Sequence, residues 1–290
     1  MAIGKKVQFF EKPQLSNPRM LLGFSGWMDG GEVSTGTVRC LVDKLGAKKF
    51  ADIDPEDFYI YNIPGSMETA ALFRPHTRVE GGVVASFELP ANEFFWDQAN
   101  NLVLFLGKEP NLRWRDFAGC LFHVCETVGV SRIYFIGSVG GLVPHTRQPR
   151  LLYCVSNPGL GENLQHYGIK ATEYEGPASF STFLSVEAAR RGLEMITLIA
   201  TIPAYVQGAN PKCIEAVTRR LAGMLSLRVD LDDISAAGDE FERKLNEIIA
   251  QQPELAGNIA KLEEDYDNEI FDNEMGDLKK WLEQKGIRLD

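Results

Sequence analysis

The sequence has no hydrophobic run long enough to cross a membrane. Its longest apolar runs, such as Leu102–Leu106 (LVLFL), have the length of a β-strand, whereas a membrane-spanning helix needs about 20 apolar residues. The first residues, MAIGKKVQFFEKPQL, lack the apolar core of a secretion signal. We therefore expect a protein with no membrane partner and no export signal.

Cysteines are few, odd in number and scattered along the chain. They are Cys40, Cys120, Cys125, Cys154 and Cys213. This pattern is typical of the reducing cytoplasm rather than of a disulfide framework, so we expect a cytoplasmic protein. Cys120, His123 and Cys125 have the composition of a metal site, but on a helix Cys125 lies about 140° around the axis from Cys120. These side chains cannot converge on one ion, so we expect no metal site.

Basic residues are not in excess over the chain as a whole. The sequence carries 30 Lys and Arg against 40 Asp and Glu, for a net charge of -10. The whole imbalance lies in residues 231–290, which hold 17 acidic and 7 basic residues, whereas residues 1–230 hold 23 of each. Nucleic-acid binding requires a basic surface, so we expect no nucleic-acid partner. An acidic, solvated helical face is the favoured interpretation of the C-terminal charge.

Three common motifs of nucleotide-binding and hydrolytic enzymes are also missing. The sequence contains no G-x-G-x-x-G, no G-K-[ST] and no G-x-S-x-G. We therefore expect no cofactor. Whether the protein is an enzyme stays open, with a protein that performs no catalysis as the favoured interpretation.

Short apolar segments alternate with amphipathic ones over most of the chain. The predicted strands are Met20–Phe24, Phe58–Ile63, Val83–Leu89, Leu102–Gly107, Arg132–Ser138, Arg150–Ser156 and Met195–Ile202. The predicted helices are Glu32–Leu45, Arg113–Val128, Ser179–Arg191 and Pro211–Leu225. Several strands are apolar without alternation, which indicates burial on both faces. The pattern predicts a three-layer α/β/α core with a mostly parallel sheet, interrupted by hairpin-like strands around residues 57–90.

Strand signals stop near Asp230, and charge rises. Helices are predicted at Leu231–Gln252, Pro253–Ile270 and Asn273–Lys285, with Pro253 at a helix start. We predict a core domain over residues 1–228 and an acidic helical C-terminal extension over residues 229–290.

Four glycine-bearing loops each follow a predicted strand, at Ser25–Gly31, Gly107–Pro110, Gly137–Arg147 and Ile202–Gly208. The carboxyl ends of parallel strands meet at one edge of a sheet, where α/β proteins bind ligands. We therefore predict a pocket formed by these loops and the nearby segment Glu173–Pro177. The predicted pocket residues are Gly26, Trp27, Asp29, Glu109, His145, Arg147, Glu175 and Tyr205.

The loop Ser25–Gly31 opens a helix, and a helix N-terminus can bind phosphate. Asp29 and Glu32, however, are spaced as a capping pair, and no Lys or Arg occurs between Arg19 and Arg39. A capped tight turn is therefore favoured over a phosphate site, with Trp27 at the rim of the pocket.

His145 and Arg147 point to the same side of an extended chain. Together they could bind an anion or supply a proton, with Glu109 or Glu175 as a base. Alternatively, Arg147 forms a surface ion pair with a carboxylate such as Glu109 or Glu175. The sequence leaves both interpretations open.

Five motifs occur in order over about residues 18–228: GFSGWMDGG, GKEPNLRW, VPHTRQP, YEGPASF and IPAYVQGANP. In these motifs the chain resembles the proteasome assembly chaperone 2 family, whose prokaryotic members have also been labelled an ATP-grasp superfamily. The acidic helical end resembles the C-terminal extension of many bacterial members. The resemblance implies an α/β/α fold similar to nucleoside phosphorylases, and homo-oligomers, for which a trimer is one candidate.

The resemblance further implies a protein-interaction or assembly-chaperone-like scaffold that associates with itself and with other proteins. Eukaryotic relatives bind partners through a C-terminal hydrophobic–Tyr–any tripeptide. The sequence ends in Arg288–Leu289–Asp290, which predicts that it does not dock in that way. The ATP-grasp label implies ATP and Mg²⁺, for which the sequence has no lysine-bearing glycine-rich loop. The alternative hypothesis is a small-molecule enzyme or sensor, with ligase or nucleoside-type chemistry, that uses the strand-end pocket.

Overall fold

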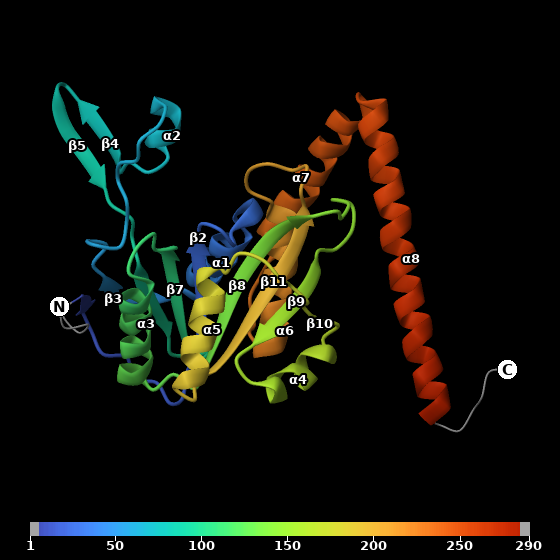
Figure 1. Cartoon of the computed structure of the whole chain (residues 1–290), viewed down its shortest axis with the longest axis horizontal. Coiled ribbons are helices and arrows are strands. Elements are labelled where there is room, and N and C mark those ends of the chain that lie inside the picture. The colour runs from blue at the N-terminus through green and yellow to red at the C-terminus, as the bar shows by residue number, and fades with distance from the viewer. Residues whose placement is uncertain (1–5, 285–290) are drawn as a thin grey trace.

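The computed structural model describes the backbone of residues 6–284 and the side chains of residues 6–271. Its centre is a nine-stranded sheet with the strand order β1-β3-β6-β7-β2-β8-β11-β9-β10 (Figure 1). The strands are β1 (Val7–Phe9), β2 (Arg19–Ser25), β3 (Lys48–Ile53), β6 (Glu93–Asp97), β7 (Leu102–Lys108), β8 (Arg132–Gly141), β9 (Arg150–Val155), β10 (Lys170–Ala171) and β11 (Glu194–Pro203).

The four central strands, β7, β2, β8 and β11, are all parallel. Arg19 at the start of β2 pairs with Leu102 of β7 on one side and with Arg132 of β8 on the other. Antiparallel pairing begins outside this centre, where β6 joins β7 and β9 joins β11. The predicted fold class is confirmed, with a parallel centre in a mixed sheet.

Helices cover both faces of the sheet, and alternate side chains of a central strand pack into the two hydrophobic cores on its two sides. In β2, Met20, Leu22 and Phe24 pack into one core with the helices α3 (Trp114–Val128) and α5 (Phe180–Arg190). Leu21 packs into the other core, with α1 (Val33–Leu45) and α6 (Pro211–Leu225). Burial on both faces explains why these strands show no polar alternation. Shorter helical elements are η2 (Gly30–Glu32), α2 (Met67–Ala71), η3 (Pro158–Leu160) and α4 (Gly161–Gln165).

Phe24, near the end of β2, lies at the centre of an aromatic cluster. Its ring centroid is 4.9–6.2 Å from those of Phe105, Phe117, Phe135 and Phe180, which come from β7, α3, β8 and α5. Aromatic pairs at such distances add to the stabilisation from burial. The cluster fixes the end of β2, and with it the start of the loop that follows.

The strand predicted at Phe58–Ile63 is wrong, because this segment is an irregular chain. Phe58 and Tyr59 are buried nonetheless. Phe58 packs edge-on against Phe117, and its carbonyl accepts hydrogen bonds from the backbone N–H groups of Asn111 and Leu112. These bonds go to the loop after β7 rather than to a neighbouring strand. Hydrophobic content alone does not distinguish a buried loop from a strand.

The strands β4 (His76–Glu80) and β5 (Val83–Glu88) form a separate two-stranded hairpin. It projects from the body together with α2 (Figure 1). Gly81 and Gly82 make the turn with φ of 56° and 80°, the left-handed conformation that a two-residue hairpin turn requires.

The C-terminal segment consists of α7 (Asp232–Ala250), which packs on α6, and α8 (Pro253–Gln284). The two helices predicted from Pro253 onward are therefore one continuous helix; the two residues between them, Phe271 and Asp272, include no proline to end it. Lys285 and the terminal Arg288–Asp290 lie outside the described residues. Within the described part of the chain, no helix combines the length and apolar character needed to cross a bilayer.

Candidate functional site

The strand pairing brings the four predicted loops to one edge of the sheet. Ser25 at the end of β2 pairs with Lys108 at the end of β7, and Gly141 at the end of β8 pairs with Pro203 at the end of β11. Beyond β2 the chain stays beside β8, because Asp29 forms an isolated parallel bridge with Ser138. The side chains at this edge form separate groups of contacts, which are described below. A single pocket shared by all eight predicted residues stays a prediction.

Glu109 joins three segments at this edge. Its carboxylate accepts hydrogen bonds from the backbone N–H of Trp27 (2.8 Å) and from that of Phe180 at the start of α5 (3.1 Å). Its own N–H donates to the carbonyl of Ser25 (2.8 Å). Gly26 lies against this carboxylate with a φ of 138°, and a Cβ there would stand 2.8 Å from Glu109 Oε2. The Glu109 side chain therefore holds the loops in place.

The carboxylate of Asp29 binds the first turn of the helix α1. Its Oδ1 accepts the backbone N–H of Thr35 (3.0 Å) and its Oδ2 accepts the Thr35 hydroxyl (2.8 Å). The N-cap position of α1 is Glu32, which has a φ of 54° and makes no capping bond. The predicted capping pair is therefore wrong in its positions, although the Asp29 carboxylate does accept an N–H of the first turn. Burial raises the pKa of Asp29 to about 6. Because the carboxylate occupies donors that a phosphate would need, the structure favours a capped turn over a phosphate cradle.

His145 is buried between the body and the helix α7. Its Nδ1 lies 2.8 Å from the Tyr205 hydroxyl, which also accepts the His145 backbone N–H, and its Nε2 lies 3.0 Å from Asn246 Oδ1. A carbonyl oxygen only accepts, so Nε2 carries the proton and Nδ1 accepts from Tyr205. Burial lowers the pKa of His145, which keeps the imidazole neutral. The ring therefore fastens α7 to the loop after β8.

Arg147 pairs with α8 rather than with Glu109 or Glu175, so the predicted surface ion pair had the wrong partners. Its guanidinium makes a two-pronged ion pair with Asp267, at 2.8 and 2.7 Å, and lies 3.6 Å from Glu263. Hydrogen bonding to Asp267 raises the pKa of Arg147.

Arg150 and Tyr266 extend the contact between this loop and α8. Arg150 forms an ion pair with Glu269 (2.8 Å) and lies over the Tyr266 ring, whose hydroxyl donates to the carbonyl of Gln148. The acidic C-terminal segment thus has a use that the sequence did not reveal. Asn246, Asp267 and Glu269 were missed, because no signal in the sequence shows which residues of the distant helices lie against this loop.

Glu175 is exposed and makes no hydrogen bond or ion pair with other described residues. The exposed surface after the parallel strands is instead apolar in three loops. Trp27 after β2 is 65% exposed, Leu142 after β8 is 83% exposed, and Leu112 after β7 is exposed as well. Large apolar side chains that remain in solvent are typical of sites that bind other proteins.

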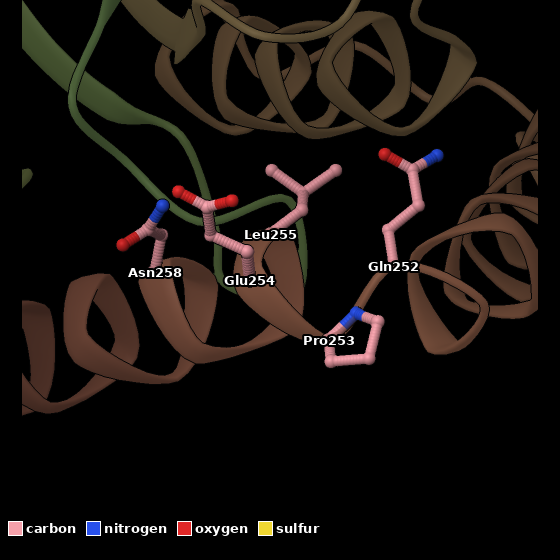
Figure 2. Close-up of a pocket in the computed structure, with 5 residues that line it drawn as sticks. All are labelled: Gln252, Pro253, Glu254, Leu255 and Asn258. Carbon is pink, nitrogen blue, oxygen red and sulfur yellow. The ribbon is translucent and has the colours of Figure 1, made fainter.

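Three cavities in the described part of the chain are lined by none of the eight predicted residues. One open hollow of about 460 Å³ lies at the turn from α7 to α8, lined by Gln252, Pro253, Glu254, Leu255 and Asn258 (Figure 2). Two others, of about 370 and 260 Å³, lie beside β1 and β3 and between α6 and α7. Among the described side chains, no three His, Cys, Asp or Glu residues are arranged to hold a metal ion.

Removing the carboxylate of Asp267 is expected to loosen α8 without unfolding the body. Because the ion pair with Arg147 is partly exposed, Asp267→Ala should lower the free energy of unfolding only slightly. Hydrogen exchange along α8 should nevertheless become faster, and more so at low salt, where the intact pair is strongest. The matched control is Asp265→Ala, because Asp265 is exposed on the same helix; equal exchange in both variants would contradict the role of Arg147.

Comparisons with known proteins agree on one family. The family model described as the PAC2 family matches residues 23–249, and no curated protein matches the chain. A proteasome-assembly chaperone homologue from Mycobacterium tuberculosis is 28% identical, with a TM-score of 0.72 over 83% of this chain and 99% of its own. A PAC2 family protein from Streptomyces avermitilis is 26% identical, with a TM-score of 0.71 over the same shares.

A proteasome activator from Pyrococcus furiosus has the same fold, with 19% identity and a TM-score of 0.61 over 83% of this chain and 97% of its own. The family model spans most of the chain and includes all eight predicted pocket residues. The chain therefore belongs to the PAC2 family.

Proposed function

We propose that this protein is a cytoplasmic assembly-chaperone-like scaffold that associates with itself and with other proteins. Similar structures include a proteasome-assembly chaperone homologue and, at lower identity, an archaeal proteasome activator. Both descriptions concern proteins that act on a protein assembly, and family membership supports the same class of role here.

The observation that carries this proposal is how the side chains at the carboxyl edge of the central sheet are bonded and exposed. Glu109, His145 and Arg147, the groups that an enzyme would use, are all engaged in contacts that hold loops and helices together. The large apolar side chains of Trp27 and Leu142 at this edge are exposed to solvent. An edge where these three polar groups are paired internally and large apolar groups are exposed suits protein binding better than chemistry.

A photo-crosslinking experiment in the native host tests this proposal. A photoreactive amino acid at position 27 should give adducts with one or a few proteins other than this chain. Leu142→Asp should reduce the adducts by about tenfold or more, because a carboxylate weakens an apolar contact. Val186→Asp is the control, since Val186 is exposed on α5. If only self-adducts form, the proposed action on other proteins is wrong.

The second candidate, a small-molecule enzyme or sensor, is favoured by Asp29. A buried carboxylate at the carboxyl edge with a pKa raised to about 6 is the kind of group that acid–base catalysis employs. A thermal-shift screen with nucleotides, nucleosides and amino acids tests this candidate. If the protein is a scaffold without a small-molecule site, no compound should shift the melting temperature by more than about 1 °C, even at a concentration ten times a millimolar Kd. A reproducible shift that Asp29→Asn abolishes would favour the enzyme instead.

A further inference from the structure

The ion pairs of the body, residues 6–228, divide into two sets. Most cations of the body that form ion pairs do so with carboxylates of the body itself, as Arg132 does with Glu194. Five cations instead find their carboxylate partners, among the described side chains, in α7 or α8. They are Lys44, Arg147, Arg150, Lys170 and Lys212. The acidic C-terminal segment therefore neutralises a basic part of the body surface.

Three of these cations pair with α8, and we call them the seat. Arg147, in the loop after β8, binds the Asp267 carboxylate through two nitrogen atoms. Glu269 bridges the other two, with one oxygen 2.8 Å from Arg150 of β9 and the other 3.6 Å from Lys170 of β10. The seat thus consists of Arg147, Arg150 and Lys170.

Few apolar contacts hold α8 against the body. Of its described side chains, residues 253–271, only Ile259 and Tyr266 are buried, and a spacing of seven residues places them on one narrow stripe of the helix. No described residue of α8 belongs to either hydrophobic core. Exposed ion pairs contribute little each and are screened by salt. Release of α8 would therefore leave both cores intact.

The loop after β8 joins the seat to the carboxyl edge of the sheet. Leu142 is exposed at that edge, and Arg147, five residues further on, binds α8. Glu263 of α8 accepts a hydrogen bond from the Thr146 hydroxyl of the same loop. When α8 leaves, cations that have lost their partners lie in the same loop as an exposed apolar side chain.

The segment that occupies the seat shows which chemistry the seat fits. Residues 253–284 hold ten acidic and three basic residues, and Glu263 and Asp267, four positions apart, share one face of the helix. The Tyr266 ring lies 4.7 Å from the Arg150 guanidinium, and arginine recognises both carboxylates and aromatic rings. Three cations are few for a nucleic acid, which binds extended basic surfaces. The seat therefore fits an acidic helix that carries an aromatic residue.

We propose that α8 is a releasable strap, and that the seat binds an acidic helix of a partner protein when the strap is open. The proposal rests on the proposed binding of other proteins and adds the chemistry of the partner and its regulation. Because the strap is covalently linked to the body, it competes at a high effective concentration. A partner helix gains access only in the fraction of molecules whose strap is open, so the strap lowers the apparent affinity for the partner.

A model acidic helix tests the proposal on the full chain. The probe is a fluorescent synthetic peptide with the sequence of residues 254–271. The strap variant carries Glu263→Gln, Asp267→Asn and Glu269→Gln, which remove the carboxylates that bind the seat and the Thr146 hydroxyl. In fluorescence anisotropy it should bind the peptide about tenfold or more tightly than wild type does, because its own α8 no longer competes.

The matched control carries Glu254→Gln, Glu264→Gln and Asp265→Asn. These substitutions remove the same charge from exposed positions of the same helix, so the control should bind the peptide like wild type. Adding Arg147→Gln and Arg150→Gln to the strap variant should abolish the gain in affinity, because the peptide then has no arginine to bind.

Several results would overturn the proposal. The strap variant could bind the peptide no more tightly than the control, or its gain could survive the loss of both arginines. Tighter binding of a single-stranded RNA of about 20 nucleotides than of the peptide would assign the seat to nucleic acid instead. Circular dichroism checks the fold. If the strap variant does not fold, hydrogen exchange of wild type decides: about 0.5 M NaCl should speed exchange in residues 253–271 but not in α6, and equal behaviour of both helices refutes a releasable strap.

Photo-crosslinking at position 27 reads the proposed scaffold function separately. If the peptide fails to bind while adducts with other proteins persist, only the seat and its strap are refuted. If those adducts are absent while the strap variant binds the peptide through its arginines, only the scaffold role is refuted.

Discussion

Replacing Gly26 by alanine is expected to lower the free energy of unfolding by about 3–5 kcal/mol, because backbone strain and broken hydrogen bonds add together. The φ of 138° at Gly26 is one that residues with a Cβ rarely adopt. The new Cβ would also stand 2.8 Å from both Cβ and Oε2 of Glu109. Glu109 would have to move, releasing the N–H groups of Trp27 and Phe180.

A double-mutant cycle separates these two causes. Urea denaturation of Gly26→Ala, Glu109→Gly and the double variant should show that Gly26→Ala costs less once both the carboxylate and the Cβ of residue 109 are gone. Gly46→Ala is the control for backbone strain alone, since Gly46 has a φ of 60° and open space around it, and it should cost about 1 kcal/mol. Additive effects of the two edge substitutions would contradict a direct clash between them.

The parallel centre of the fold was predictable because its signals are local. Leu21 and Leu104 lie in runs that are apolar at consecutive positions, and such runs occur in strands that are buried on both faces. The strands β3 (KKFADI) and β6 (EFFWD), which lie beyond β7 on the antiparallel side of the sheet, were missed because their charged residues are exposed or half-buried and only part of each strand is buried. Tertiary pairing, rather than composition, makes these segments strands.

For the candidate site, the sequence predicted which loops meet at one edge of the sheet, but not which side chains bond to one another. Placing Glu109 and Gly26 at one edge follows from parallel strands and the loops after them. The partner of Arg147 did not follow, because Asp267 lies 120 positions further along the chain and many carboxylates of the acidic segment were equivalent in sequence. Likewise, the sequence identifies His145 as a titratable group but not as one enclosed by Tyr205 and Asn246. Burial, which determines the ionisation of such a group, is a property of the fold.

Asp29→Asn is expected to stabilise the protein at neutral pH by about 1–3 kcal/mol. The pKa of Asp29 rises from 3.8 to about 6 on folding, mainly through burial. Between these values the folded chain binds more protons than the unfolded chain, so the contribution of Asp29 to stability falls as pH rises from about 4 to 6. Asparagine has no proton to lose, and its amide can keep both bonds to Thr35 by accepting from the N–H and donating to the hydroxyl.

The advantage of Asp29→Asn over wild type should therefore grow between pH 4 and pH 6 and stay constant above pH 7, as measured by urea denaturation across this range. Asp265→Asn, on the exposed side of α8, should show no such dependence. A difference between Asp29→Asn and wild type that does not change with pH would mean that burial does not oppose ionisation of Asp29. If the substitution stabilises the chain but reduces photo-crosslinking at position 27, Asp29 serves the function of this edge. The wild-type carboxylate would then lower the stability of the fold and support partner binding at the same position.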